Sequence, residues 1–292
     1  MRTLTLLFLA LATAAGALPG VSVNDPHILV HDGVERTYFL HVPDGIAPGA
    51  PLVVVLHGLG GRAEKLRYGT EMNALADAHG FAVVYPQGLD YKPTSSHWNA
   101  GFNFSDVDDL GFLTALVAQL DTRHQLSPAK SFAVGISNGG YMAYHMACHA
   151  PEVFAGIAVI AGTMAGGDWG DCDPQDPTAV LHIHGTEDPM IRWEGARHWM
   201  SGGKSLPPVR EIVNFWRGRH GTELRINERR GPYELERYSV AGRDAVWFVG
   251  LEGFGHDLPN EGNAGFSAVA LSWEFFASLQ KQRRTRLTAR GK

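Results

Sequence analysis

Residues 131–147 read SFAVGISNGGYMAYHMA, and this stretch decides the fold. Its first six residues form an apolar run that predicts a strand, and its last eight predict a helix. Between them lies the pattern G-x-S-x-G, residues 135–139, with Ser137 at its centre. A serine at a sharp strand-to-helix turn exposes its hydroxyl, and the flanking glycines let neighbouring chain approach without a Cβ clash. The stretch therefore predicts a nucleophile elbow, against the alternative of a glycine-rich turn with a chance serine.

A nucleophilic serine needs a general base, and the base needs a carboxylate that orients it. The strand expected at 179–184 runs into a loop that carries Asp188, and the strand expected at 245–251 runs into a glycine-flanked loop that carries His256. Both loops follow the elbow in the chain order Ser, Asp, His and are expected at its edge of a parallel sheet. We predict Asp188 as the acid and His256 as the base. Glu187 is the neighbouring alternative to Asp188 and is interpreted as a solvated loop residue.

The other acidic and histidine candidates have structural interpretations. Three aspartates precede the serine, which breaks the expected order, and they suit the first turn of a helix: Asp106, Asp108 and Asp109. Two histidine pairs are interpreted as packed on a strand or as structural on the elbow helix: His182 with His184, and His145 with His149. No group of histidines and carboxylates has metal-ligand spacing along the sequence, so we expect no metal and no cofactor.

The reaction also requires an oxyanion hole. The residue after the nucleophile, Asn138, would supply one backbone N–H. The loop His57-Gly-Leu-Gly-Gly follows the strand expected at 52–56 and matches the glycine-rich type that aims a second amide at the developing oxyanion. Leu59 is the predicted donor, with Gly58 and Gly60 as alternatives in register.

The remaining pattern alternates strands and helices, which predicts an α/β fold with a mostly parallel, doubly wound sheet in a single domain. Strands are expected at 36–42, 52–56, 81–85, 131–136, 154–160, 179–184 and 245–251, and helices at 63–79, 107–126, 207–217 and 266–279. The connection at 162–178 is short, which predicts little or no cap and an open site. Trp98, Trp193 and Trp199 could line that site, although packing within a loop is the alternative for each.

The chain termini and the cysteines indicate an oxidising compartment. Within 292 residues, residues 1–17 have the charge, apolar core and A-x-A pattern of a secretory signal peptide, which predicts a secreted protein without a stable membrane anchor. The catalytic domain would span 18–280, followed by a basic, solvated tail at 281–292. Cys148 and Cys172 precede neighbouring parallel strands at the same edge, so a disulfide is expected, with two free thiols as the alternative. The net charge of −5 speaks against nucleic acid as a partner.

Several motifs together resemble the secreted polyhydroxybutyrate depolymerase-like and feruloyl esterase-like α/β-hydrolases. The resemblance runs from about Arg36 to His256 and rests on LVVVLHG (52–58), WNAG (98–101), VDDLGF (107–112), GISNGGYM (135–142), HGTED (184–188) and GH (255–256). It implies Ser137, Asp188 and His256 as the triad, in agreement with the assignment from chain order. Two segments depart from the family pattern, Asp257-Leu-Pro and Ile191-Arg-Trp, and both are expected near the substrate.

The sequence thus predicts a secreted serine carboxylesterase that forms an acyl-enzyme. Its substrates would be 3-hydroxybutyrate-type polyesters or feruloyl and acetyl esters of polysaccharides. A serine peptidase of the prolyl-oligopeptidase type shares the motif, but only about thirty mature residues precede the strand at 52–56. A non-catalytic secreted binding protein on a hydrolase fold is the other alternative.

Overall fold

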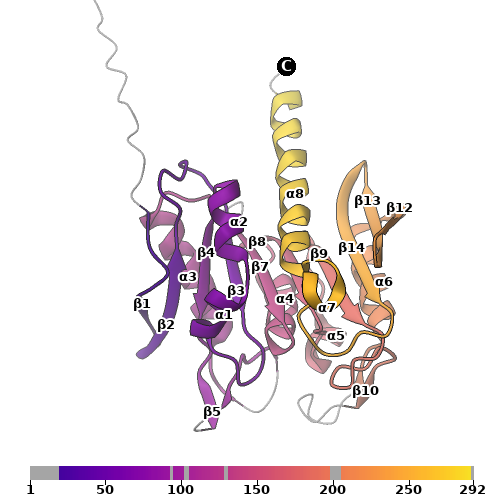
Figure 1. The fold of residues 1–292 in the computed structure, drawn as a ribbon, viewed down its shortest axis with the longest axis horizontal. Coiled ribbons are helices and arrows are strands. Elements are labelled where there is room, and N and C mark those ends of the chain that lie inside the picture. The colour runs from indigo at the N-terminus through magenta and orange to yellow at the C-terminus, as the bar shows by residue number, and fades with distance from the viewer. Residues whose placement is uncertain (1–19, 93–94, 102–104, 128–130, 198–204, 291–292) are drawn as a thin grey trace, which may run out of the picture.

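A ten-stranded sheet forms the centre of the protein (Figure 1). The structure is a computed structural model that describes residues 20–92, 95–101, 105–127, 131–197 and 205–290. Across the sheet the strands are ordered β1 (Pro26–His31), β2 (Val34–His41), β4 (Ala82–Pro86), β3 (Leu52–Leu56), β7 (Ser131–Ile136), β8 (Phe154–Ile160), β9 (Ala179–Gly185), β14 (Arg243–Leu251), β13 (Tyr233–Val240) and β12 (Glu223–Arg230). The six strands from β4 to β14 run parallel, and the two strands outside each end of this block are antiparallel.

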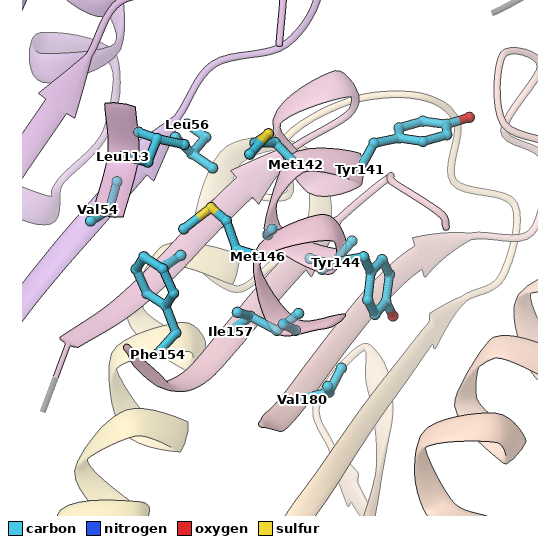
Figure 2. Packing of buried hydrophobic residues seen from close by; sticks show 14 of the residues in the cluster. Val54, Leu56, Leu113, Tyr141, Met142, Tyr144, Met146, Phe154, Ile157 and Val180 are labelled. Atoms are coloured by element: carbon cyan, nitrogen blue, oxygen red, sulfur yellow. The ribbon is translucent and has the colours of Figure 1, made fainter. Parts of the chain in front are cut away.

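Helices cover both faces of the sheet because its central strands are apolar on both faces. Along β3, Leu52, Val54 and Leu56 pack into one hydrophobic cluster, and Val53 and Val55 pack into the other. The first cluster includes residues of α3 (Asp109–Arg123), α4 (Asn138–His149) and α6 (Val209–His220), and the second includes residues of α1 (Ala63–Gly69), α2 (Met72–His79) and α8 (Ala268–Arg290). Figure 2 shows α4 lying over the strands that contribute Val54, Ile157 and Val180 to the first cluster. This arrangement confirms the predicted α/β fold.

Several short elements lie at the edge of the sheet at which the parallel strands end. They are β5 (Asp90–Lys92) with β6 (Ser95–Ser96), β10 (Ala196–Arg197) with β11 (Ser205–Leu206), and α7 (Glu261–Ala264). The short helix α5 (Gly166–Asp171) instead lies beside the last turn of α4. In Figure 1, β5 and β10 lie at the bottom of the view, whereas the C-terminal end of α8 projects from the top. Within the described residues, α5 is the one helix between β8 and β9, so the expected small connection holds.

The predicted central strands match the observed ones to within two residues at each end. The helix expected at 63–79 is broken into α1 and α2, because Thr70 is extended and its hydroxyl caps the carbonyl of Leu66. The helix expected at 266–279 continues to Arg290, so most of the segment predicted as a basic tail belongs to α8. No helix among the described residues is long and apolar enough to span a bilayer. The expected signal peptide lies outside the described residues.

Candidate active site

The elbow serine has a strained backbone. Ser137 adopts φ 54° and ψ −116°, outside the regions that residues with a side chain prefer. Its N–H donates to the carbonyl of Ile160 on β8 at 2.9 Å. The two motif glycines make this turn possible, since a Cβ on Gly135 would lie 2.1 Å from the carbonyl oxygen of Gly139, and one on Gly139 would lie 2.4 Å from that of Leu56. The sequence therefore forms, between β7 and α4, the sharp turn that a nucleophile elbow requires.

The three residues predicted from chain order lie in hydrogen-bond contact. His256 Nε2 is 2.9 Å from Ser137 Oγ, and His256 Nδ1 is 2.7 Å from Asp188 Oδ2. Asp188 follows β9, and His256 follows β14. With Nδ1 protonated and donating to Asp188, Nε2 can accept the serine proton, which is the arrangement of a general base.

The buried carboxylate of Asp188 is held by its own loop. Its Oδ1 accepts the backbone N–H groups of Met190 and Ile191, both at 2.8 Å. Burial raises the pKa of Asp188, but hydrogen bonds from His256 and Ile191 outweigh it and leave that pKa below its ordinary value. Asp188 is therefore an anion at neutral pH. The alternative, Glu187, is exposed, in agreement with its interpretation as a solvated residue.

Two buried histidines of β9, His182 and His184, support the loop that carries Asp188. The Tyr144 hydroxyl donates to His182 Nδ1 at 2.6 Å, His182 Nε2 lies 3.2 Å from His184 Nδ1, and His184 Nε2 lies 2.8 Å from the carbonyl of Ile191. Burial lowers the pKa of both histidines, so both are neutral, and one assignment of protons satisfies the whole chain. The expected packing role is confirmed, and the contact with Ile191 adds a support that sequence spacing did not indicate.

The glycine-rich loop after β3 lies directly beside Ser137. A Cβ built on Gly58 would be 3.3 Å from Ser137 Cβ. Burial lowers the pKa of His57 to about 4, so this histidine is neutral: Nδ1 donates to the Gly58 carbonyl, and Nε2 accepts the N–H of Gly88. The N–H of Gly60 donates to the backbone carbonyl of Ser96, so Gly60 is excluded as an alternative oxyanion donor. The assignment of the Leu59 and Asn138 backbone N–H groups as oxyanion donors stays a prediction.

One tryptophan expected to line the substrate site lies in the core instead. Trp98 is fully buried, and its indole N–H donates to the carbonyl of His57. The Asn138 side chain bonds both the N–H and the carbonyl of Trp98, at 2.7 and 3.1 Å. The prediction of Trp98 as a substrate contact is therefore wrong, because this residue fastens the glycine-rich loop to the elbow.

Trp193, by contrast, is partly exposed and packs against His184 and Phe248, at 6.3 and 5.9 Å between ring centroids. Contact between Trp193 and substrate stays a prediction. Trp199 lies outside the described residues.

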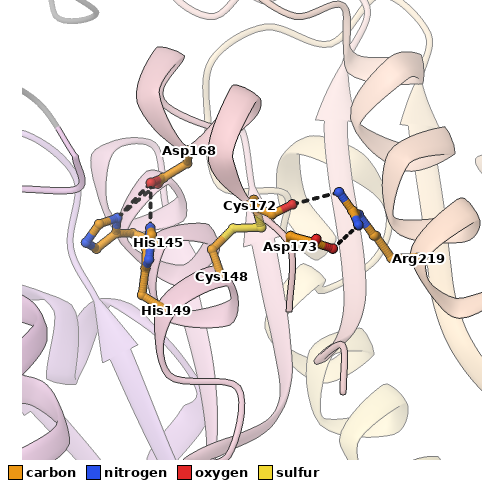
Figure 3. The surroundings of a disulfide bond; sticks show 7 residues. All are labelled: His145, Cys148, His149, Asp168, Cys172, Asp173 and Arg219. Carbon is orange, nitrogen blue, oxygen red and sulfur yellow. Dashed lines mark hydrogen bonds and ion pairs between the residues drawn. A yellow bond between two sulfur atoms is a disulfide. The ribbon is translucent and has the colours of Figure 1, made fainter. Parts of the chain in front are cut away.

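Two of the competing aspartates have structural roles. Asp109 is buried and pairs with Arg36 at 2.5 Å while it accepts the N–H of Asn99 at 2.7 Å. Asp108 caps α3 by accepting the N–H of Gly111. The predicted disulfide between Cys148 and Cys172 is present, with 5.2 Å between the Cα atoms (Figure 3).

Solved structures of known proteins share this fold. Over 87% of this chain and 99% of its own, an acetyl xylan esterase from Aspergillus awamori has the same fold, with a TM-score of 0.65 at 18% identity. The fold is thus that of the α/β-hydrolase esterases.

The family follows from sequence. The family model described as esterase PHB depolymerase matches residues 36–181. A feruloyl esterase C from Emericella nidulans is 33% identical over 250 residues, which cover 82% of this chain and 83% of the relative. The chain therefore belongs to the polyhydroxybutyrate depolymerase and feruloyl esterase-like family of carboxylic ester hydrolases. A protein of Nocardia uniformis subsp. tsuyamanensis named only as a candidate esterase, NocK, is 34% identical over 171 residues, 56% of this chain and 48% of that relative.

Proposed function

We propose that the protein is a serine carboxylesterase whose nucleophile is Ser137, whose general base is His256 and whose orienting acid is Asp188. The observation that carries this proposal is the continuous hydrogen-bonded chain Ser137–His256–Asp188, at 2.9 and 2.7 Å. A non-catalytic binding protein would have no use for a strained serine held against a histidine in this way.

In the proposed reaction, Ser137 Oγ attacks the ester carbonyl while His256 Nε2 takes the hydroxyl proton. The negative charge on the carbonyl oxygen would be bound by the backbone N–H groups of Leu59 and Asn138. His256 then gives the proton to the departing alcohol, which leaves an acyl-enzyme. Water, deprotonated by the same histidine, hydrolyses the acyl-enzyme and restores the serine.

The decisive test is Ser137→Ala with p-nitrophenyl butyrate as substrate. We expect kcat to fall at least about 1,000-fold, because the covalent step is lost. The control is Ser22→Ala, an exposed serine outside the site. Retention of a tenth of the wild-type kcat in Ser137→Ala would contradict the proposal. A fluorophosphonate probe should label the wild type and the control but not Ser137→Ala, and no labelling of the wild type would favour the non-catalytic alternative.

Among substrates, we propose esters of aromatic acids of the feruloyl type. The support is the 33% identity to the feruloyl esterase C of Emericella nidulans, which extends over 82% of the chain. The partly exposed Trp193 offers an aromatic surface for such an acyl group. Polyesters of the 3-hydroxybutyrate type are the second candidate, supported by the family model that matches residues 36–181.

The test is kcat/KM on methyl ferulate, an acetylated xylan and a 3-hydroxybutyrate oligomer, with a short prolyl peptide to examine the peptidase alternative. The highest value on methyl ferulate is expected, and a highest value on the oligomer would instead support the polyester candidate.

We propose further that the protein is secreted. The signal-peptide pattern at residues 1–17 and the disulfide both support an oxidising compartment. Deletion of residues 2–17 should retain the protein inside the producing cell, and export of the truncated chain would contradict this proposal.

A further inference from the structure

A cluster of two histidines and an aspartate lies beside the disulfide, at the far end of the elbow helix (Figure 3). His145 and His149 are four residues apart on α4, which puts both rings on one face of the helix. Figure 3 shows both rings directed at Asp168, which belongs to α5. His145 Nδ1 is 3.0 Å and His149 Nε2 is 2.9 Å from the carboxylate oxygens. Nothing in the proposed ester hydrolysis uses these residues.

The distances from the two histidine nitrogens to the carboxylate are close to those around a small divalent ion, and the three ligand atoms lie within 4.8 Å of one another. A tetrahedral ion bound at 2.0–2.1 Å holds its ligand atoms about 3.3 Å apart. The nitrogen-to-oxygen distances of 2.9 to 3.1 Å are therefore only a few tenths of an ångström too short. Each imidazole would present the nitrogen that now faces Asp168 as the ligand, which for a neutral ring needs only a change of tautomer.

The chemistry of the group selects the kind of ion. Two imidazoles and one carboxylate suit zinc and its neighbours, whereas calcium and magnesium prefer oxygen ligands alone. The carboxylate is buried, with 5% of the Asp168 side chain exposed, while 39% of the His149 side chain is exposed. Water can therefore reach the cluster from the His149 side and fill a fourth position.

The disulfide holds the two helices that supply the ligands. Cys148 lies between the two histidines in the sequence of α4, and the N–H of Cys172 donates to the backbone carbonyl of Asp168, one turn earlier, at 2.9 Å. Arg219 holds the chain just after α5, because its guanidinium donates to the carbonyl of Cys172 and to the carboxylate of Asp173. Because these contacts fix the positions of both backbones, an ion would meet ligands that are already in place.

We propose that His145, His149 and Asp168 form a binding site for a zinc-type divalent metal ion that braces the end of α4 against α5. The sequence did not indicate this site, because Asp168 lies 19 residues beyond His149 and no ligand spacing connects them. This proposal departs from the expectation, drawn from sequence spacing, that the chain holds no metal.

The test is calorimetric titration of the chelator-treated full chain with zinc chloride at neutral pH. We expect one zinc ion per chain. In His149→Gln and in Asp168→Asn, the dissociation constant should rise at least about 100-fold, since loss of a mere supporting contact already costs 10–100-fold. His149 is partly exposed, so its variant should fold normally.

The matched control is His31→Gln, which removes the histidine of the one other such cluster among the described residues, His31 with Asp32 and Asp108. Zinc affinity should be unchanged in this control. A second readout is the melting temperature, which should rise by about 5–10 °C for the wild type at a hundredfold excess over the dissociation constant, and not for His149→Gln. Absence of saturable binding would overturn the proposal, as would binding that survives both His149→Gln and Asp168→Asn.

Discussion

Gly139→Ala tests whether the close approach of β3 to the elbow sets the position of Ser137, the proposed nucleophile. A Cβ at this residue would lie 2.4 Å from the carbonyl oxygen of Leu56 and 2.7 Å from that of His57. Both atoms belong to the backbone, so rotation of a side chain cannot relieve the clash. Restoring an ordinary contact of 3.4 Å requires the elbow and the end of β3 to separate by about 1 Å. The loop that follows β3 carries the predicted oxyanion donor, so this separation moves Ser137 away from it.

A displacement of about 1 Å at a reacting centre costs on the order of 100-fold in rate. We therefore expect kcat/KM on p-nitrophenyl butyrate to fall about 100-fold in Gly139→Ala. The free energy of unfolding should fall by about 1–3 kcal/mol, as for other overpacked sites. Thermal melting, measured on the same samples, establishes that the variant is folded at the assay temperature.

The matched control is Gly218→Ala, the same chemical change on the exposed side of α6. A Cβ there would have no atom within 4 Å, so kcat/KM should be unchanged and the protein stabilised by roughly 0.5–1 kcal/mol. A folded Gly139→Ala that keeps more than a third of the wild-type kcat/KM would refute the reasoning, because the elbow would then tolerate the separation.

Three further predictions concern stability, measured as the free energy of unfolding in urea. The pKa of His57 is about 4 in the folded protein and near 6.5 in the unfolded chain, so the unfolded chain binds a proton at higher pH than the folded protein does. The free energy of unfolding therefore falls by up to roughly 3 kcal/mol as the pH drops from 6.5 to 4. The stability difference between wild type and His57→Gln should shrink by that amount between pH 7 and pH 4; an unchanged difference would exclude His57 as the cause. Asp109→Ala should cost about 3–5 kcal/mol, because it leaves Arg36 buried without its partner; a loss below about 1 kcal/mol would mean that water or another group replaces the carboxylate. Replacing Cys148 and Cys172 together by alanine should cost about 3–4 kcal/mol for a sequence separation of 24, and equal stability of the variant and the wild type would argue against the entropic account.

The central sheet was predictable because its strands are apolar without interruption. A run such as Leu52–Leu56 has no polar face, so it must be covered on both sides, and that requirement defines a parallel sheet between helices. The outer strands β12 and β13 were not predicted. Their sequences, ELRINERR and YELERYSV, carry charged residues among the apolar ones, and their place in the sheet depends on the neighbouring strand β14.

The candidate triad could be predicted because each member follows a strand in a fixed order. The surroundings of the triad could not, because they depend on contacts between loops that are distant in sequence. Trp98 is buried because Asn138, 40 residues later, bonds its backbone, and no local pattern encodes that contact. The cluster around Asp168 arises in the same way, from two helices that a disulfide brings together.

The alternation of strand direction at the end of the sheet has a practical consequence. The turn at Ala241 and Gly242 connects β13 to the start of β14, whereas His256 follows the end of β14. The nine residues of β14 separate these two ends by about 30 Å. A Cβ on Gly242 would have no atom within 4 Å. A linker attached at this turn would therefore fix the enzyme to a solid support with the candidate triad facing outward, toward polymers too large to diffuse around the molecule.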